Sequence, residues 1–175
     1  MDDRHLLVGR LLLSKRDWRK AEIELKRSLS LCASADDSAT VHFSLARMYE
    51  LTNRPSYARA HYSSVSAFTE TFHQAQSNIG VLLAKAADLD SALYYVTTAL
   101  SHEPNHEPAQ KTFRSVVLQL IKQGSVATVE RECRRLLVTV PESREGRLIL
   151  AGALHMQAKF AEAAIQSEVL VGRSP

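Results

Sequence analysis

The residues best suited to chemistry gather in one short segment, His-Glu-Pro-Asn-His-Glu-Pro, at residues 102–108. Two histidines four residues apart could bind one metal ion if the segment were helical. Pro104 lies between His102 and His106 and forbids a regular helix there, because proline lacks the backbone N–H and clashes with the preceding turn. The segment is therefore predicted to be a turn between two helices rather than a metal site.

The two cysteines, Cys32 and Cys133, lie 101 residues apart and cannot form a disulfide framework or a zinc site alone. This usage fits a reducing compartment, so we expect a cytoplasmic or other reducing intracellular location. Cys133 falls on a packing position and Cys32 at a helix end. No Ser/His/Asp grouping, phosphate-binding glycine loop or acid–base pair is evident. The sequence predicts no enzyme, no cofactor and no metal.

A length of 175 residues suits one domain or several copies of a small repeat. With 45% hydrophobic and 23% charged residues, the chain resembles an ordinary globular protein and not a disordered one. The net charge of +3 is too small for a protein that coats nucleic acid. The apolar run 6–13 is too short to span a membrane, and the acidic start Met1-Asp2-Asp3 does not resemble a signal peptide.

The elements that must position any site are helices, because apolar residues recur at steps of three and four. Val41, Leu45, Met48 and Leu51 are one such series. The prolines fall at the predicted helix boundaries, and no linker divides the chain. The sequence therefore predicts an all-α protein.

A repeat register connects these helices. One alanine position recurs with spacings of 37, 34, 37 and 34 residues, and a second position, twelve residues earlier, holds mostly small residues. Small residues at both positions allow two antiparallel helices to cross closely. The first position is occupied by Ala21, Ala58, Ala92, Val129 and Ala163, and the second by Gly9, Ala46, Gly80, Val117 and Ala151.

This register resembles the tetratricopeptide repeat (TPR) family over essentially the whole chain. The best match is the third repeat, with Asn78-Ile79-Gly80, Asp88-Leu89, Ala92-Leu93 and Ala99-Leu100. The resemblance implies one domain, 1–175, built as a right-handed superhelical α-solenoid of about ten antiparallel helices. Its repeats would span 2–35, 39–72, 73–106, 107–143 and 144–175. The fourth departs most, with Val117, Val129 and Leu136 at its small-residue sites, so its two helices are predicted to lie further apart.

The resemblance also implies that the first helix of each repeat lines a concave groove. The predicted groove mixes cations with apolar side chains, which suits an extended or helical partner segment carrying acidic and aliphatic residues. The groove-facing positions are Leu6, Arg10, Phe43, Arg47, Ser77, Val81, Lys85, Arg114, Leu118, Lys122 and Leu148.

Three functions stay open on this basis. The first is a non-enzymatic scaffold or adaptor that binds proteins in a multi-subunit assembly. The second is a co-chaperone or cargo receptor that binds peptides reversibly, although the two-carboxylate clamp of some TPR co-chaperones is missing. The third, less favoured, is RNA binding, since the basic cluster Arg131, Arg134 and Arg135 is interleaved with Glu130 and Glu132.

The last predicted helix, 160–171, is more apolar than one buried face requires. Helical-repeat arrays normally finish with a helix whose outer face is polar. We therefore expect the C-terminal end to be covered by further repeats, by a second copy of the chain or by a different subunit.

Overall fold

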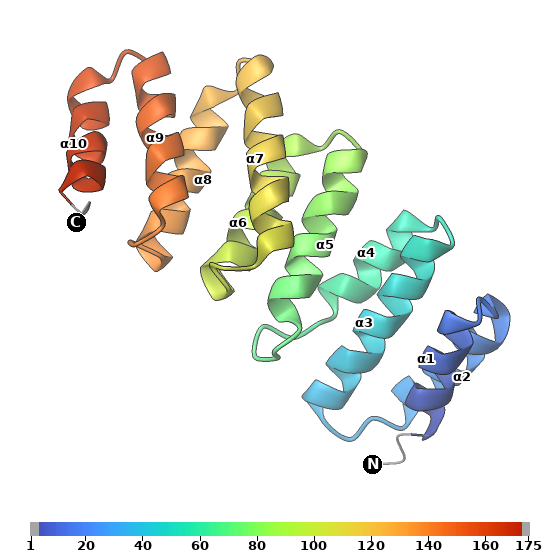
Figure 1. Cartoon of the computed structure of the whole chain (residues 1–175). Helices are drawn as coiled ribbons and strands as arrows, with labels where there is room; N and C mark the ends of the chain where they lie inside the picture. Colours follow the sequence, from blue (N-terminus) through green and yellow to red (C-terminus); the bar gives the residue numbers. More distant parts are fainter. Residues whose placement is uncertain (1–3, 173–175) are drawn as a thin grey trace. The chain divides into compact units, whose positions relative to one another are not determined.

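The computed structural model describes residues 4–172, and every regular element within them is an α-helix (Figure 1). The fold is therefore all-α, as predicted. In chain order the helices are α1 (Arg4–Ser14), α2 (Trp18–Ser30), α3 (Ala35–Leu51), α4 (Pro55–Ser63), α5 (Phe72–Lys85), α6 (Leu89–His102), α7 (Glu107–Lys122), α8 (Val126–Thr139), α9 (Arg144–Met156) and α10 (Phe160–Val171).

The described residues separate into two compact units. The N-terminal unit runs up to Ile79 and the C-terminal unit begins at Gly80, so the division falls inside α5. No change in composition marks this point, and the single domain 1–175 stays a prediction.

Within each unit, first and second helices of successive pairs form two layers. In the N-terminal unit α1 and α3 lie in front of α2 and α4, and in the C-terminal unit α7 and α9 lie in front of α6 and α8 (Figure 1). Three second helices also pack on the next first helix: α2 on α3, α6 on α7 and α8 on α9. We call the surface formed by α1 and α3, and that formed by α5, α7 and α9, the first-helix face of each unit.

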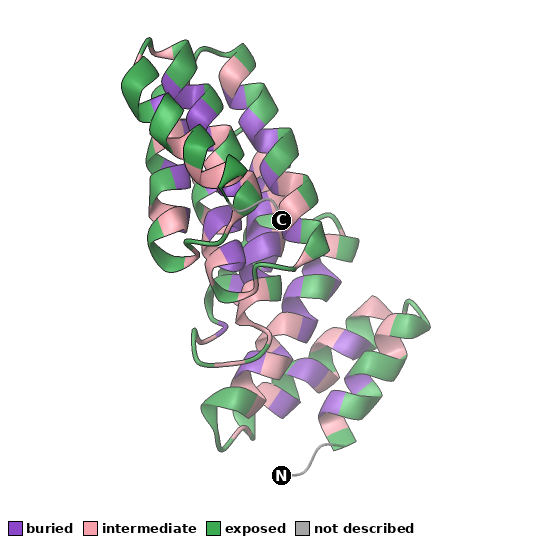
Figure 2. Ribbon diagram, turned by 60° about the vertical axis from the view of Figure 1, so that its left-hand side comes forward, coloured by how far each residue is buried: buried purple, intermediate pink, exposed green. Residues whose placement is uncertain are grey.

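Small residues allow the close crossing of paired helices. A Cβ atom added to Gly9 would lie 2.8 Å from Leu25 Cδ2, and one added to Gly80 would lie 2.3 Å from Val96 Cγ2. Buried residues follow the sides on which helices face one another within each unit (Figure 2). The alanine positions of the register are buried: Ala21, Ala58, Ala92 and Ala163.

The fourth pair departs from this pattern, as the sequence predicted. Val117 and Val129 replace small residues and are 5% and 0% exposed. Their backbones are kept apart by the larger side chains, and α7 and α8 approach each other closely over less of their length than α1 and α2 do.

The turn inside each pair repeats one backbone conformation. The first helix of each pair is followed by a residue with φ between 56° and 80°, in the left-handed region. These residues keep the register of the alanines, and they are Arg16, Asn53, Ala87, Gly124 and Ala158. Four of the five carry a side chain in a conformation that favours glycine.

Side chains also fix where several helices begin. Asp17 accepts a hydrogen bond from the Lys20 N–H at 3.3 Å, and Asp88 accepts one from the Ser91 N–H at 3.3 Å. α3 begins at Ala35, before the predicted start of the second repeat at 39, because Ser34 caps it by accepting from the Asp37 N–H.

Candidate protein-binding surface

The first-helix face of the N-terminal unit contains a hollow of about 300 Å³ between α1 and α3. Arg10 and Arg47 line it and are exposed, and neither forms an ion pair with any residue between 4 and 172. Apolar side chains accompany these two cations. We call this feature the α1–α3 hollow, and its lining residues are Arg10, Leu13, Ser14, Phe43, Ser44, Arg47 and Leu51.

Phe43 is held in this hollow by a fully buried tyrosine. The rings of Phe43 and Tyr62 meet edge to face with centroids 5.4 Å apart. The Tyr62 hydroxyl donates to Glu50 Oε2 at 3.1 Å and accepts from Asn78 Nδ2 at 3.0 Å. Burial, reinforced by the Glu50 carboxylate, raises the pKa of Tyr62, so its hydroxyl stays protonated and keeps donating. The aromatic wall of the hollow is therefore rigidly supported.

The spacing of α1 and α3 is fixed through α2. Gly9 allows α1 to approach α2 closely. The Tyr49 hydroxyl of α3 donates to Glu22 Oε1 of α2 at 2.8 Å, and Lys26 Nζ pairs with the same oxygen at 2.6 Å. Hydrogen bonds to a charged group are among the stronger ones in proteins. The two walls of the hollow are thus tied to a common helix.

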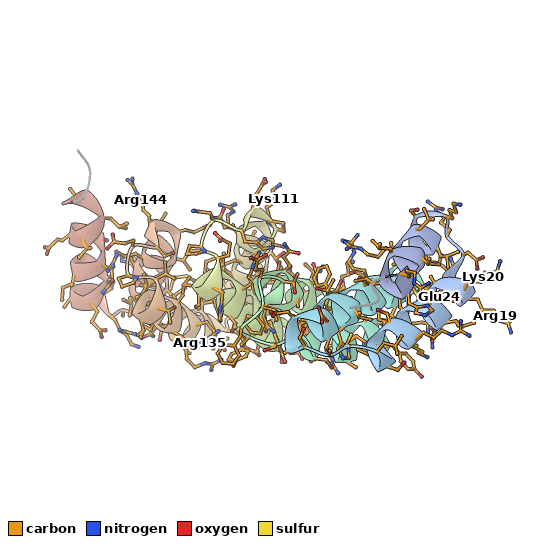
Figure 3. All side chains as sticks on the ribbon, turned by 90° about the horizontal axis from the view of Figure 1, so that it is seen from below. Arg19, Lys20, Glu24, Lys111, Arg135 and Arg144 are labelled. Carbon is orange, nitrogen blue, oxygen red and sulfur yellow. The ribbon has the colours of Figure 1, made fainter. Side chains whose placement is uncertain are left out.

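The C-terminal unit has a second hollow of about 360 Å³ between α5 and α7. Lys85 is exposed in it and forms no ion pair between residues 4 and 172, whereas Lys111 pairs with Glu107 at 2.6 Å. Figure 3 shows Lys111 pointing to the opposite side of this unit from Arg135. We call it the α5–α7 hollow, lined by Val81, Ala84, Lys85, Lys111, Thr112, Ser115, Val116 and Gln119.

Two predicted groove residues are not available for binding. Leu6 is buried, and Ser77 is 0% exposed, with a hydroxyl that finds no hydrogen-bond partner. Both lie three positions before the small residue of their helix. That position is on the side of these helices that is covered, so neither residue is kept in the proposed surface.

The other predicted residues lie on α7 and α9 of the C-terminal unit. Arg114 pairs with Glu145 of α9 at 3.1 Å, so its charge already has an internal partner. Leu118 and Leu148 are 54% and 63% exposed. Lys122 is exposed at the last position of α7. These residues continue the mixture of apolar and basic side chains, without lining either hollow.

Several lining residues were missed in the sequence. Ser14 and Leu51 lie five positions after their small residue, as Lys85 does, and extending that position to every repeat would have found them. Three other lining residues lie earlier on α7: Lys111, Thr112 and Ser115. The equivalent positions of the other repeats do not hold residues of the same type, so the register could not have found them.

The basic cluster on α8 is largely neutralised by carboxylates. Arg134 pairs with Glu130 at 2.9 Å and also with a carboxylate of α10, Glu162. Arg135 pairs with Glu132 at 2.8 Å. The Arg134–Glu162 pair joins α8 to α10, and the cluster as a whole leaves little free charge for phosphates.

The sequence candidates for chemistry have structural roles. Residues 103–106 form the turn between α6 and α7, as predicted. Burial raises the pKa of the Cys133 thiol to about 12, which keeps it out of the reactive thiolate form. Between residues 4 and 172, no three His, Cys, Asp or Glu side chains are grouped to hold a metal ion. In the same range, no helix has the length and apolar character to cross a bilayer.

A histidine pair joins α3 and α4 behind the first-helix face. His42 Nδ1 and His61 Nδ1 are 2.9 Å apart, so one ring donates and the other accepts. His61 also stacks on Tyr49 with ring centroids 5.3 Å apart. Burial lowers the pKa of both histidines, and for His61 the proximity of His42 and Lys26 lowers it further. The pair is therefore built to be neutral.

The fold has clear counterparts among solved structures. Pseudomonas aeruginosa PilF superposes with a TM-score of 0.57 at 18% identity, covering 99% of this chain and 76% of its own. The TPR domain of P58(IPK) gives 0.57 at 16% identity, covering 99% and 60%, and MamA gives 0.56 at 13%, covering 94% and 93%. No protein-family profile and no curated protein matches the sequence.

These similarities define the class of fold. The chain has a TPR-like fold, an all-α solenoid of helix–turn–helix units. At identities below one fifth they define the architecture alone, and the function must be argued from the surface of this chain.

Proposed function

We propose that this protein is a non-enzymatic scaffold or adaptor that binds a segment of a partner protein on its first-helix faces, within a multi-subunit assembly. The observation that carries the proposal is the α1–α3 hollow. Two arginines without internal carboxylate partners flank Leu13, Phe43 and Leu51 there. Unpaired cations beside apolar side chains complement a segment that carries acidic and aliphatic residues.

The α5–α7 hollow supports the same chemistry in the C-terminal unit. Lys85 supplies an unpaired cation, and Val81, Ala84 and Val116 supply apolar surface. A partner segment of this kind would gain orientation and association rate from the charges, and affinity from burial of its aliphatic residues. A reversible peptide receptor, such as a co-chaperone or cargo receptor, would use the same hollows.

The test is charge reversal in the hollow with a matched control. Arg10→Glu/Arg47→Glu should weaken binding of a fluorescein-labelled peptide of alternating glutamate and leucine by at least about tenfold, measured by fluorescence anisotropy. Arg59→Glu is the control, because Arg59 is an exposed arginine of α4 that forms no ion pair between residues 4 and 172. Arg114 is unsuitable, because its reversal would place a carboxylate beside Glu145.

Equal affinity of the wild type, the double variant and the control would contradict binding in the hollow. Binding of a single-stranded RNA with steep salt dependence, and none of the peptide, would instead support the RNA-binding alternative. A stable stoichiometric complex with a co-purifying protein favours the scaffold, whereas rapid micromolar exchange of the peptide favours the receptor.

A further inference from the structure

Each first helix carries an aliphatic residue directly before its small residue, and in three helices of the interior this residue is covered. Leu45, Val116 and Leu150 hold the position in α3, α7 and α9 and are 0%, 0% and 2% exposed. The preceding second helices α2, α6 and α8 pack on these three helices. Val8 holds the same position in α1 and is 44% exposed. α1 therefore displays a surface that second helices cover elsewhere in the chain.

Val8 belongs to an apolar strip on α1. Leu7 and Leu11 lie beside it and are 62% and 54% exposed. In α3 the residue equivalent to Leu11 is Met48, which is 1% exposed. We call Leu7, Val8 and Leu11 the α1 strip. Covering three such side chains removes apolar surface from water, which is the main driving force for association.

The last helix, α10, also exposes apolar residues whose equivalents in other second helices are covered. In α6, which packs on α7 and α8, Leu89 and Leu100 are 4% and 5% exposed, and the equivalent residues of α2 and α8 are half-buried. The equivalent residues of α10 are Phe160 and Val171, which are 58% and 73% exposed. α10 therefore exposes apolar positions that are at least half-buried in α2, α6 and α8, the helices that pack on a following first helix.

We infer that α10 of one molecule packs on the α1 strip of a second copy, as α2 packs on α3 within the chain. A second copy fits because this chain carries both halves of the interface, and each half is equivalent to an interface already formed inside it. The contact is head to tail, so each added copy leaves one α1 and one α10 open, and association continues without closing. This inference goes beyond the proposed function, because neither hollow takes part in it.

The test uses one variant for each half of the interface. Light scattering after size-exclusion chromatography should give the wild-type chain a mass that rises with concentration above 19.5 kDa. Val8→Glu and Val171→Glu should each raise the apparent dissociation constant by at least about tenfold and stay monomeric. An equimolar mixture of the two should form a dimer and nothing larger, because one variant keeps an intact α10 and the other an intact α1.

The matched control substitutions are made at a position of the register that is exposed in the second helices inside the chain as well as at its ends. Ile23 and Ile165, two residues after the alanine of the register, are 47% and 56% exposed, like Tyr94 at 48%. Ile23→Glu and Ile165→Glu should therefore associate like the wild type, and circular dichroism should show that all four variants fold. The inference is overturned by a wild type that is monomeric at every concentration, by a mixture that forms no dimer, or by an association that Val171→Glu leaves intact.

Discussion

Gly80→Ala tests the close approach of α5 to α6, the contact that the small-residue register predicts. A Cβ atom at Gly80 would lie 2.3 Å from Val96 Cγ2 and 3.3 Å from the Ala92 carbonyl oxygen. Val96 is fully buried and β-branched, and in a helix one χ1 rotamer dominates for valine, so the methyl group cannot turn away at low cost. Overpacking costs about 1–3 kcal/mol, and the helix propensity of alanine over glycine returns up to about 1 kcal/mol. The net expectation is a loss of about 1 kcal/mol.

The sign of this effect should reverse when Val96 is truncated. Val96→Ala removes the obstructing methyl group, so Gly80→Ala in that background should stabilise the protein by up to about 1 kcal/mol through helix propensity alone. The coupling energy of the double-mutant cycle is then about 2 kcal/mol, within the range for residues in direct contact. The cavity cost of Val96→Ala cancels in the cycle.

Urea unfolding followed by far-ultraviolet circular dichroism measures all four corners of the cycle. Gly152→Ala is the matched control, because it makes the same exchange inside a helix where an added Cβ atom meets nothing within 4 Å. It should stabilise the protein by up to about 1 kcal/mol. If Gly80→Ala stabilised the wild type as much as Gly152→Ala does, or acted alike in both backgrounds, the close crossing of α5 and α6 would be refuted.

Four further predictions concern two core residues, a buried glutamate and the pH dependence. Ala92→Leu should lower the free energy of unfolding by about 1–3 kcal/mol by overpacking, and Val129→Ala by about 2 kcal/mol, because both side chains are 0% exposed; thermal melts check both. Glu132→Ala should cost about 1–3 kcal/mol in urea unfolding, since it removes the carboxylate that accepts hydrogen bonds from the partly exposed Arg131 and Arg135, and an unchanged free energy of unfolding would contradict this. His42 and His61 have folded-state pKa values below the ordinary value, so the unfolded chain takes up protons first, and stability should be full above about pH 6.5 and fall below it. His42→Gln/His61→Gln should flatten that pH profile, and an unchanged slope would show that the pair is not responsible.

The register predicted the fold because its small residues mark the positions where two helix backbones come close together. A glycine or alanine recurring at two fixed offsets is needed only where two backbones meet closely, as at Gly9 and Gly80. Such a pattern can be found in a single sequence, without knowing which helices are in contact. The division inside α5 left no trace in the sequence, because it depends on how tightly whole groups of helices pack and not on any residue type.

The residues that line the two hollows were predicted only in part, because a register fixes the direction of a side chain but not its depth. The position after the small residue gave Arg10 and Arg47, and both line the α1–α3 hollow. The position three residues before it gave the half-buried Phe43 but also the buried Leu6 and Ser77, since depth depends on the size of neighbouring side chains.

Ion pairs between helices were also beyond prediction from spacing. Arg114 and Glu145 are 31 residues apart, and their pairing follows from the packing of α7 beside α9. Sequence periodicity describes one helix at a time. It does not predict which charged residue of a neighbouring helix will lie opposite a given charged residue.

The residue with left-handed backbone conformation in the turn of each pair makes most of these turns less stable than they would be with glycine. Arg16, Ala87 and Ala158 adopt this conformation at φ near 60°, where a side chain costs about 1–2 kcal/mol, and only the fourth pair supplies a glycine, Gly124. A glycine at any of the three sites would raise stability by up to about 1 kcal/mol after its own entropic cost. In a repeat array, stability is approximately a sum over repeats and their neighbours. Local opening of individual helix pairs could therefore be slowed one pair at a time, with the first-helix faces and the terminal helices left unaltered.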